Sequence, residues 1–212
     1  MIYFAIFLVE LFVLWRLSRV INSRFYNSLP FGLYAVLFLP GTFIHELSHF
    51  LMAKLLFVPV GKFTIRPQKY EKEVVLGSVS IAGVDIMRRL VIGAAPVIFG
   101  LFLVMATIYL VIANNLIRDT RIAILVSYVV FIVGNTMFSS KKDMEGAWKV
   151  AISSSVIFFI FYLLGIRFYL NFESAFFARI IEVVKLMNLY LLAPIAIDAL
   201  ISACYLLKNK IF

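Results

Sequence analysis

The chain has 212 residues, of which 64% are hydrophobic, with a mean hydropathy of +1.04 and a formal net charge of +9. A soluble domain of this size does not bury so much apolar surface, and the apolar runs are too continuous for a transmembrane β-barrel. The composition therefore predicts an all-α polytopic membrane protein. Its basic residues are scattered over short loops, which favours contact with anionic lipid headgroups over nucleic acid.

About six apolar segments are expected to cross the membrane. The first, Ile2 to about Leu17, is expected to be a retained anchor, because it lacks the features of a cleaved signal peptide. The second begins at Leu33, and its Pro40-Gly41 pair is expected to restart the helix near Thr42, which would cap it. The later spans are expected at Arg89–Ala113, Ile122–Phe138, Val150–Ile166 and Leu189–Leu207, with an interfacial amphipathic helix over Arg167–Lys185.

A change of pattern separates the second span from the third. From Val60 to Ala82, apolar residues alternate with polar ones on both sides of a charged segment, Gln68–Glu73. This pattern predicts a β-hairpin at the membrane face, with an edge strand whose N–H and C=O groups are unpaired.

The strongest motif lies in the second span, where His45-Glu46-Leu47-Ser48-His49 has the form H-E-x-x-H. On a helix, residues four apart leave the same face, so both imidazoles can hold one tetrahedral Zn²⁺. Glu46 is placed to act on water as a general base. His45 and His49 are the only histidines of the chain. The alternative is three polar residues satisfied inside a helical bundle, but charged groups in a span are costly and usually functional.

A catalytic zinc usually takes a third protein ligand, and Asp143 at the end of the fourth span is the preferred candidate. Glu145 is its main competitor, and Glu173 is a further one. Two acids inside other spans, Glu10 and Asp198, could line a water path or make a hydrogen bond inside the bundle. Cys204 is expected to be a packing residue.

These residues resemble the site-2 proteases, which are intramembrane zinc metalloproteases. His45–His49 followed by Ala53 is similar to that family's H-E-x-x-H-x-x-x-A, and Gly93-Ala94-Ala95-Pro96 is similar to its G-P-x-x-N segment, with Phe99 or Gly100 about where the asparagine is expected. The stretch from Asn135 to Asp143 keeps the spacing of its N-x-x-P-x-x-x-L-D-G motif but departs from it at the proline, the leucine and the glycine. The resemblance covers roughly residues 33–146.

The resemblance implies a compact form of the family, a single domain over residues 1–212 without a PDZ-like domain, whose core spans about 33–146 and is followed by helices over 150–207. It implies a zinc-dependent endopeptidase that hydrolyses transmembrane or membrane-proximal segments of other membrane proteins. Asp143 would be the third zinc ligand, and Asn135 could donate to the oxyanion; its alternative is helix packing. A prokaryotic cell membrane, with the site near the cytosolic side, is expected.

Two other classes remain open from the sequence. A metalloprotease-like regulator would bind transmembrane segments without cutting them, which the altered Asp143 region allows. A channel or transporter would use Glu10 and Asp198 in a polar path, although paired repeat halves are not visible in the sequence.

Overall fold

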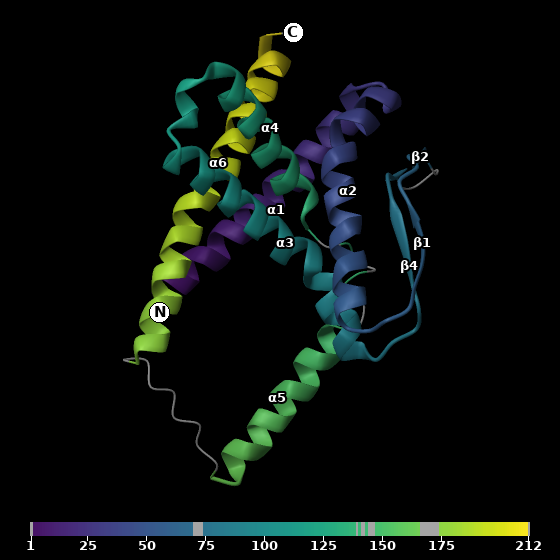
Figure 1. Cartoon of the computed structure of the whole chain (residues 1–212), viewed down its shortest axis with the longest axis vertical. Coiled ribbons are helices and arrows are strands. Elements are labelled where there is room, and N and C mark those ends of the chain that lie inside the picture. Colours follow the sequence, from purple (N-terminus) through teal and green to yellow (C-terminus); the bar gives the residue numbers. More distant parts are fainter. Residues whose placement is uncertain are drawn as a thin grey trace.

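The computed structural model describes residues 2–69, 74–138, 140, 143, 147–165 and 174–211; for 69, 74, 75, 147, 148, 151 and 208–211 it describes the backbone only. Within these ranges the fold is mostly helical, with a small β-hairpin beside the bundle (Figure 1). The helices are α1 Ile2–Ser28, α2 Phe31–Leu55, α3 Ile86–Ala113, the 3-10 turn η1 Leu116–Arg118, α4 Thr120–Thr136, α5 Ala147–Leu163 and α6 Ala175–Ile211. The strands are β1 Val60–Thr64, β2 Gln68–Lys69, β3 Val74–Val75 and β4 Ser78–Ile81.

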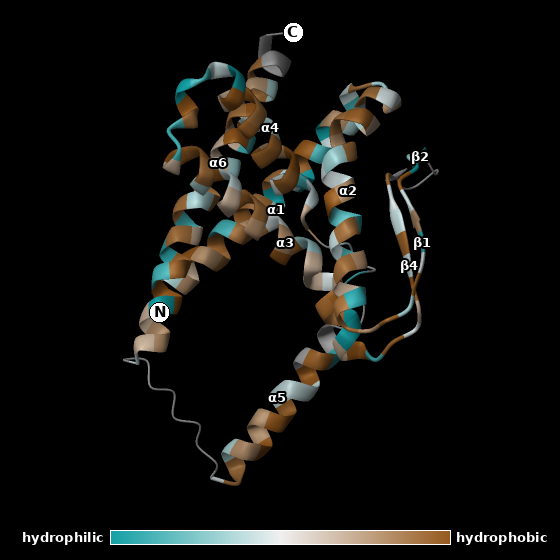
Figure 2. Cartoon of the chain, in the orientation of Figure 1, coloured by the Kyte–Doolittle hydropathy of each residue, from teal (hydrophilic) through white to brown (hydrophobic). Residues whose placement is uncertain are grey.

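Three of the described helices are long and apolar enough to cross a membrane: α2, α3 and the Ala175–Leu207 part of α6. The expected number of six spans is not supported. In the described chain, α4 and α5 have 17 residues each, below the roughly 20 that a bilayer core requires. The helix α1 is long, but it carries Glu10 and three arginines. Figure 2 shows hydrophobic residues along the helices. Large apolar side chains on the outside of the helices are exposed, among them Phe102 at 71% and Leu200 at 67%.

The predicted restart of the second helix at Pro40-Gly41 is wrong, because α2 runs unbroken through both residues. Proline removes one helical N–H, and neighbouring groups can compensate for that loss. The carbonyl that Pro40 leaves without its helical donor is that of Val36. One residue further along, the Tyr128 hydroxyl of α4 donates to the Leu37 carbonyl over 2.8 Å and ties this stretch of α2 to α4. Thr42 is not a cap, because its hydroxyl donates to the Phe38 carbonyl inside the helix. The helices α1 and α2 are separated at Pro30, since α1 ends at Ser28 and α2 begins at Phe31.

The C-terminal helices also differ from the expectation. Residues 175–185, assigned to an interfacial helix, continue without a break into the sixth apolar segment and form the single helix α6 through Pro194. Much of α6 lies along α1, and the two helices exchange polar contacts such as Arg24 Nη1 to the Ser202 carbonyl at 3.2 Å. The helix α5 leaves the bundle at its N-terminal end, and most of its described side chains are exposed (Figure 1).

The predicted hairpin is confirmed in the described residues. Strand β1 pairs antiparallel with β4, with Phe63 opposite Val79, and β2 pairs antiparallel with β3 further along the same arm. The β1–β4 register has an irregularity between Val60 and Phe63. Figure 1 shows the hairpin beside α2, with β4 nearer to that helix than β1. The hairpin therefore lies along the helix that carries the H-E-x-x-H motif.

The core lies where α1, α2, α3 and α4 meet. Its buried members are chiefly Ile21, Tyr34, Phe38, Val104 and residues 130–133. A buried polar contact lies beside this core, where the Asn135 amide of α4 donates to Asp198 of α6. Small residues let the helices approach closely. A Cβ on Gly41 of α2 would collide with the Thr136 side chain of α4, so the motif helix is pressed against the end of α4.

Candidate metal centre

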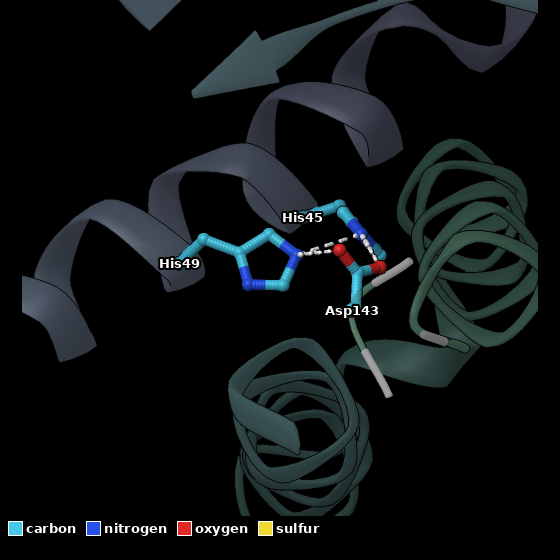
Figure 3. A group of neighbouring side chains, drawn as sticks. All are labelled: His45, His49 and Asp143. Atoms are coloured by element: carbon cyan, nitrogen blue, oxygen red, sulfur yellow. Dashed lines mark hydrogen bonds and ion pairs between the residues drawn. The ribbon is translucent and has the colours of Figure 1, made fainter. Parts of the chain in front are cut away.

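Three side chains from two parts of the chain converge at the motif helix. One ligand atom each from His45, His49 and Asp143 lies within 4.8 Å of the others, a group that could hold a metal ion. Figure 3 shows both imidazoles leaving α2 toward the Asp143 carboxylate, which comes from the segment after α4. His49 Nε2 is 3.6 Å from Asp143 Oδ1, and His45 Nε2 is 3.9 Å from Oδ2. The predicted ligand set is thus brought together, with Asp143 in the third position.

Backbone carbonyls fix the orientation of both imidazoles. His45 Nδ1 lies 2.7 Å from the Thr136 carbonyl oxygen at the end of α4, and His49 Nδ1 lies 2.8 Å from the Ile92 carbonyl oxygen of α3. A carbonyl oxygen only accepts, so each Nδ1 must carry the proton and donate it. Each Nε2 then presents a lone pair. This arrangement of an anchored Nδ1–H and a free Nε2 is usual for metal-ligating histidines.

The distance between the two Nε2 atoms shows whether these residues fit a metal ion. His45 Nε2 and His49 Nε2 lie 3.2 Å apart, and neither has a proton to give to the other when both rings are neutral. Two facing lone pairs, with a carboxylate beside them, repel unless a cation lies between them. Zinc–nitrogen bonds of 2.0–2.1 Å in a tetrahedron put two nitrogens about 3.3 Å apart. The observed spacing of the nitrogens therefore suits a tetrahedral divalent ion.

Asp143 is held by its own turn and by α3. Its Oδ2 accepts from the Ser140 backbone N–H over 2.6 Å, and the Ser140 hydroxyl accepts from the Asp143 N–H over 3.2 Å. A Cβ on Gly93 would collide with the Asp143 carbonyl, so this glycine lets the segment lie against α3. Burial alone would raise the pKa of Asp143, but the facing histidines, whenever an Nε2 carries a proton, and Ser140 hold it well below its usual range. The carboxylate is thus ionised and available as a ligand.

Glu46, the predicted general base, lies half-buried between α2 and the hairpin. The backbone of Val79 in β4 lies on the side of its carboxylate. A Cβ on Gly77 would come within 2.9 Å of Glu46 Cγ and 3.1 Å of Thr42 Cγ2, so only glycine lets the hairpin approach this closely. The hairpin therefore covers the base.

Asn135 is not brought into the ligand group. Its two amide protons go to the Phe131 carbonyl over 2.9 Å and to Asp198 Oδ1 over 2.8 Å. An oxyanion role stays a prediction, and it would require the amide to exchange these partners.

Glu10 and Asp198 likewise lie outside the group, and Cys204 is exposed. The competing ligands Glu145 and Glu173 lie outside the described residues.

Sequence reasoning missed the groups that orient the ligands. The Thr136 and Ile92 carbonyls are backbone atoms, which carry no residue-type signature. Two indirect signals were present in the sequence. Thr136 precedes the expected end of a helix, where carbonyls lack helical donors, and Pro96 follows Ile92 by four residues.

A scan of protein-family models and searches of the curated proteins and of the solved structures found no match to this chain.

Proposed function

We propose that the chain is a zinc-dependent intramembrane endopeptidase of the site-2 protease type, which hydrolyses transmembrane or membrane-proximal segments of membrane proteins. The observation that carries this proposal is the convergence of His45, His49 and Asp143 on a membrane-capable helix, with Glu46 adjacent to the first histidine. Glu10 and Asp198, on which the channel or transporter hypothesis depends, lie outside this group. The site is proposed to lie near the cytosolic face, as in the family that the motifs resemble.

In this proposal His45, His49 and Asp143 hold the zinc, which would polarise the scissile carbonyl and make water a better nucleophile. Glu46 accepts a proton as the water oxygen bonds to the carbonyl carbon. When the C–N bond breaks, Glu46 returns that proton to the amine nitrogen of the leaving fragment. The Nδ1 bonds to Thr136 and Ile92 keep the imidazoles aligned throughout.

A substrate helix has its carbonyls hydrogen-bonded and must unwind before hydrolysis. An edge of the β1–β4 hairpin offers backbone groups to which the unwound segment could pair as an added strand. Strand β4 lies against Glu46, so a segment bound there would pass close to the base.

The test combines metal analysis with cleavage. Purified protein in detergent should contain about one zinc per chain and cut a membrane-segment peptide, and Glu46→Gln should keep the zinc but lose cleavage by about 10²–10⁴-fold. Zinc without any Glu46-dependent cleavage, over a panel of membrane segments, would favour the non-proteolytic regulator. A protein that binds no zinc would contradict both functions and favour a channel or transporter.

A further inference from the structure

The Ile92 carbonyl that anchors His49 lies inside α3, where a helical carbonyl normally accepts from the N–H four residues later. That later residue is Pro96, which has no N–H to donate. We propose that Pro96 is a positioning residue of the metal centre: by withholding the helical donor, it reserves the Ile92 carbonyl for His49 Nδ1–H and so sets the tautomer that points Nε2 at the metal. This inference rests on the metal centre of the proposed function.

The two histidines obtain their carbonyl acceptors in different ways. His45 uses the carbonyl of Thr136, the last residue of α4, where the helix has no further donor to offer. His49 is 5% exposed and lies against the second turn of α3, where a carbonyl would ordinarily accept from the N–H four residues later. A proline is the one residue type that frees such a carbonyl without ending the helix, and α3 continues from Pro96 to Ala113.

The same turn of α3 also lies against the backbone of the third ligand, Asp143. Gly93, directly after Ile92, lets the Asp143 backbone approach the helix. Within five residues, Ile92–Pro96, α3 therefore anchors one ligand and accommodates another. Pro96 itself is fully buried and does not belong to the ligand group, so its influence on the metal acts through the carbonyl.

The decisive variants are Pro96→Ala, which restores an N–H at position 96, and a backbone ester made by incorporating lactic acid there, which has alanine's side chain but no N–H. Loss of a second-shell partner typically lowers metal affinity 10–100-fold. Because a carbonyl can accept twice, we expect Pro96→Ala to weaken zinc binding by about tenfold, at the lower end of that range. The ester should bind zinc within about twofold of the wild type.

The matched control is Pro194→Ala. Pro194 is also fully buried inside a helix, but it packs against Gly134 instead of against the ligand group. Its substitution should leave the zinc affinity unchanged whatever it does to stability.

A second readout separates positioning from general damage. His45 and His49 are the only histidines, so ¹⁵N-histidine labelling reports on these two rings alone, and His45→Gln assigns them. In zinc-free wild type, at a pH where both rings are neutral, His49 should carry its proton on Nδ1. In Pro96→Ala, a fraction of the His49 rings should carry the proton on Nε2 instead. In the ester variant, His49 should stay protonated on Nδ1.

Three outcomes would overturn the inference: an unchanged zinc affinity and tautomer in Pro96→Ala, an ester as weak as the alanine variant, or a wild-type His49 protonated on Nε2. If Pro96→Ala does not fold, the wild-type tautomer and the ester still decide. A wild type that binds no zinc would instead contradict the proposed function, and the tautomer measurement would remain valid for the zinc-free protein.

Discussion

The Asn135 amide donates to Asp198 Oδ1 over 2.8 Å and joins α4 to α6 inside the bundle. The other two oxygens of the pair, Asn135 Oδ1 and Asp198 Oδ2, are buried without a hydrogen-bond partner in the described part of the chain. Asp198 is completely buried. A buried carboxylate with an unpartnered oxygen is costly.

This pair predicts opposite results for two substitutions of Asp198. Asp198→Asn keeps the shape and an acceptor and adds a donor that can reach Asn135 Oδ1, so the melting temperature in detergent should equal or exceed that of the wild type. Asp198→Ala leaves a buried amide donor without its partner and should cost about 1–3 kcal/mol of unfolding free energy. A similar loss in both variants would show that the charge itself is required.

The third ligand can be tested by zinc affinity. Asp143→Ala should weaken zinc binding strongly, because it removes the only carboxylate in the described ligand group. Glu145→Ala serves as the control and should bind zinc like the wild type, measured by competition with a chelator. If Glu145→Ala loses the metal and Asp143→Ala keeps it, the assignment of Asp143 is wrong.

Gly93→Ala should displace Asp143 without touching any ligand side chain. The added Cβ would collide with the Asp143 carbonyl, a backbone atom that cannot rotate away. We expect a loss of zinc affinity of about tenfold or more, comparable to that of second-shell changes. Gly32→Ala is the matched control, because a Cβ there meets nothing within 4 Å. Equal affinities in the two variants would contradict the close approach.

Gly77→Ala should affect catalysis but not metal binding. Its Cβ would press against Glu46 and Thr42 and push β4 away from the base. Cleavage should slow while the zinc content stays at the wild-type level. Gly61→Ala is the control, since its Cβ meets Ser80 of the hairpin and not Glu46. Zinc lost together with activity in Gly77→Ala would mean that the hairpin supports the metal centre itself.

The proposed membrane orientation can be tested through α3, which lies between the hairpin and the loop that begins at Asn114. With Cys204 replaced by serine, single cysteines at Lys69 and Asn115 should lie on opposite sides if α3 spans the membrane. An impermeant thiol reagent applied to intact cells should label position 115 and not position 69. The reverse pattern would overturn the cytosolic placement of the site.

Local patterns predicted much of the arrangement because local physics determines it. The spacing of His45 and His49 requires only a helix, and the alternation from Val60 to Ala82 requires only a strand pair. Asp143 was preferred from its place at the end of the fourth span, and the family resemblance implied the same residue; no local pattern brings it to residues nearly a hundred positions earlier. The continuity of α2 could not be predicted, because a local rule for Pro40-Gly41 takes no account of the contacts that α2 makes with α3 and α4.

The helix α6 has 37 residues, which corresponds to a rod of about 55 Å. The hydrocarbon core of a bilayer is about 30 Å thick, and transmembrane helices rarely tilt beyond about 40°. Even at that inclination, roughly 26 residues fill the apolar slab and about 11 remain outside it. If α6 spans the bilayer, these residues lie among headgroups or in water, at one end or divided between both. Since α1 lies against α6, bilayer thickness would then determine how much of the pair is immersed.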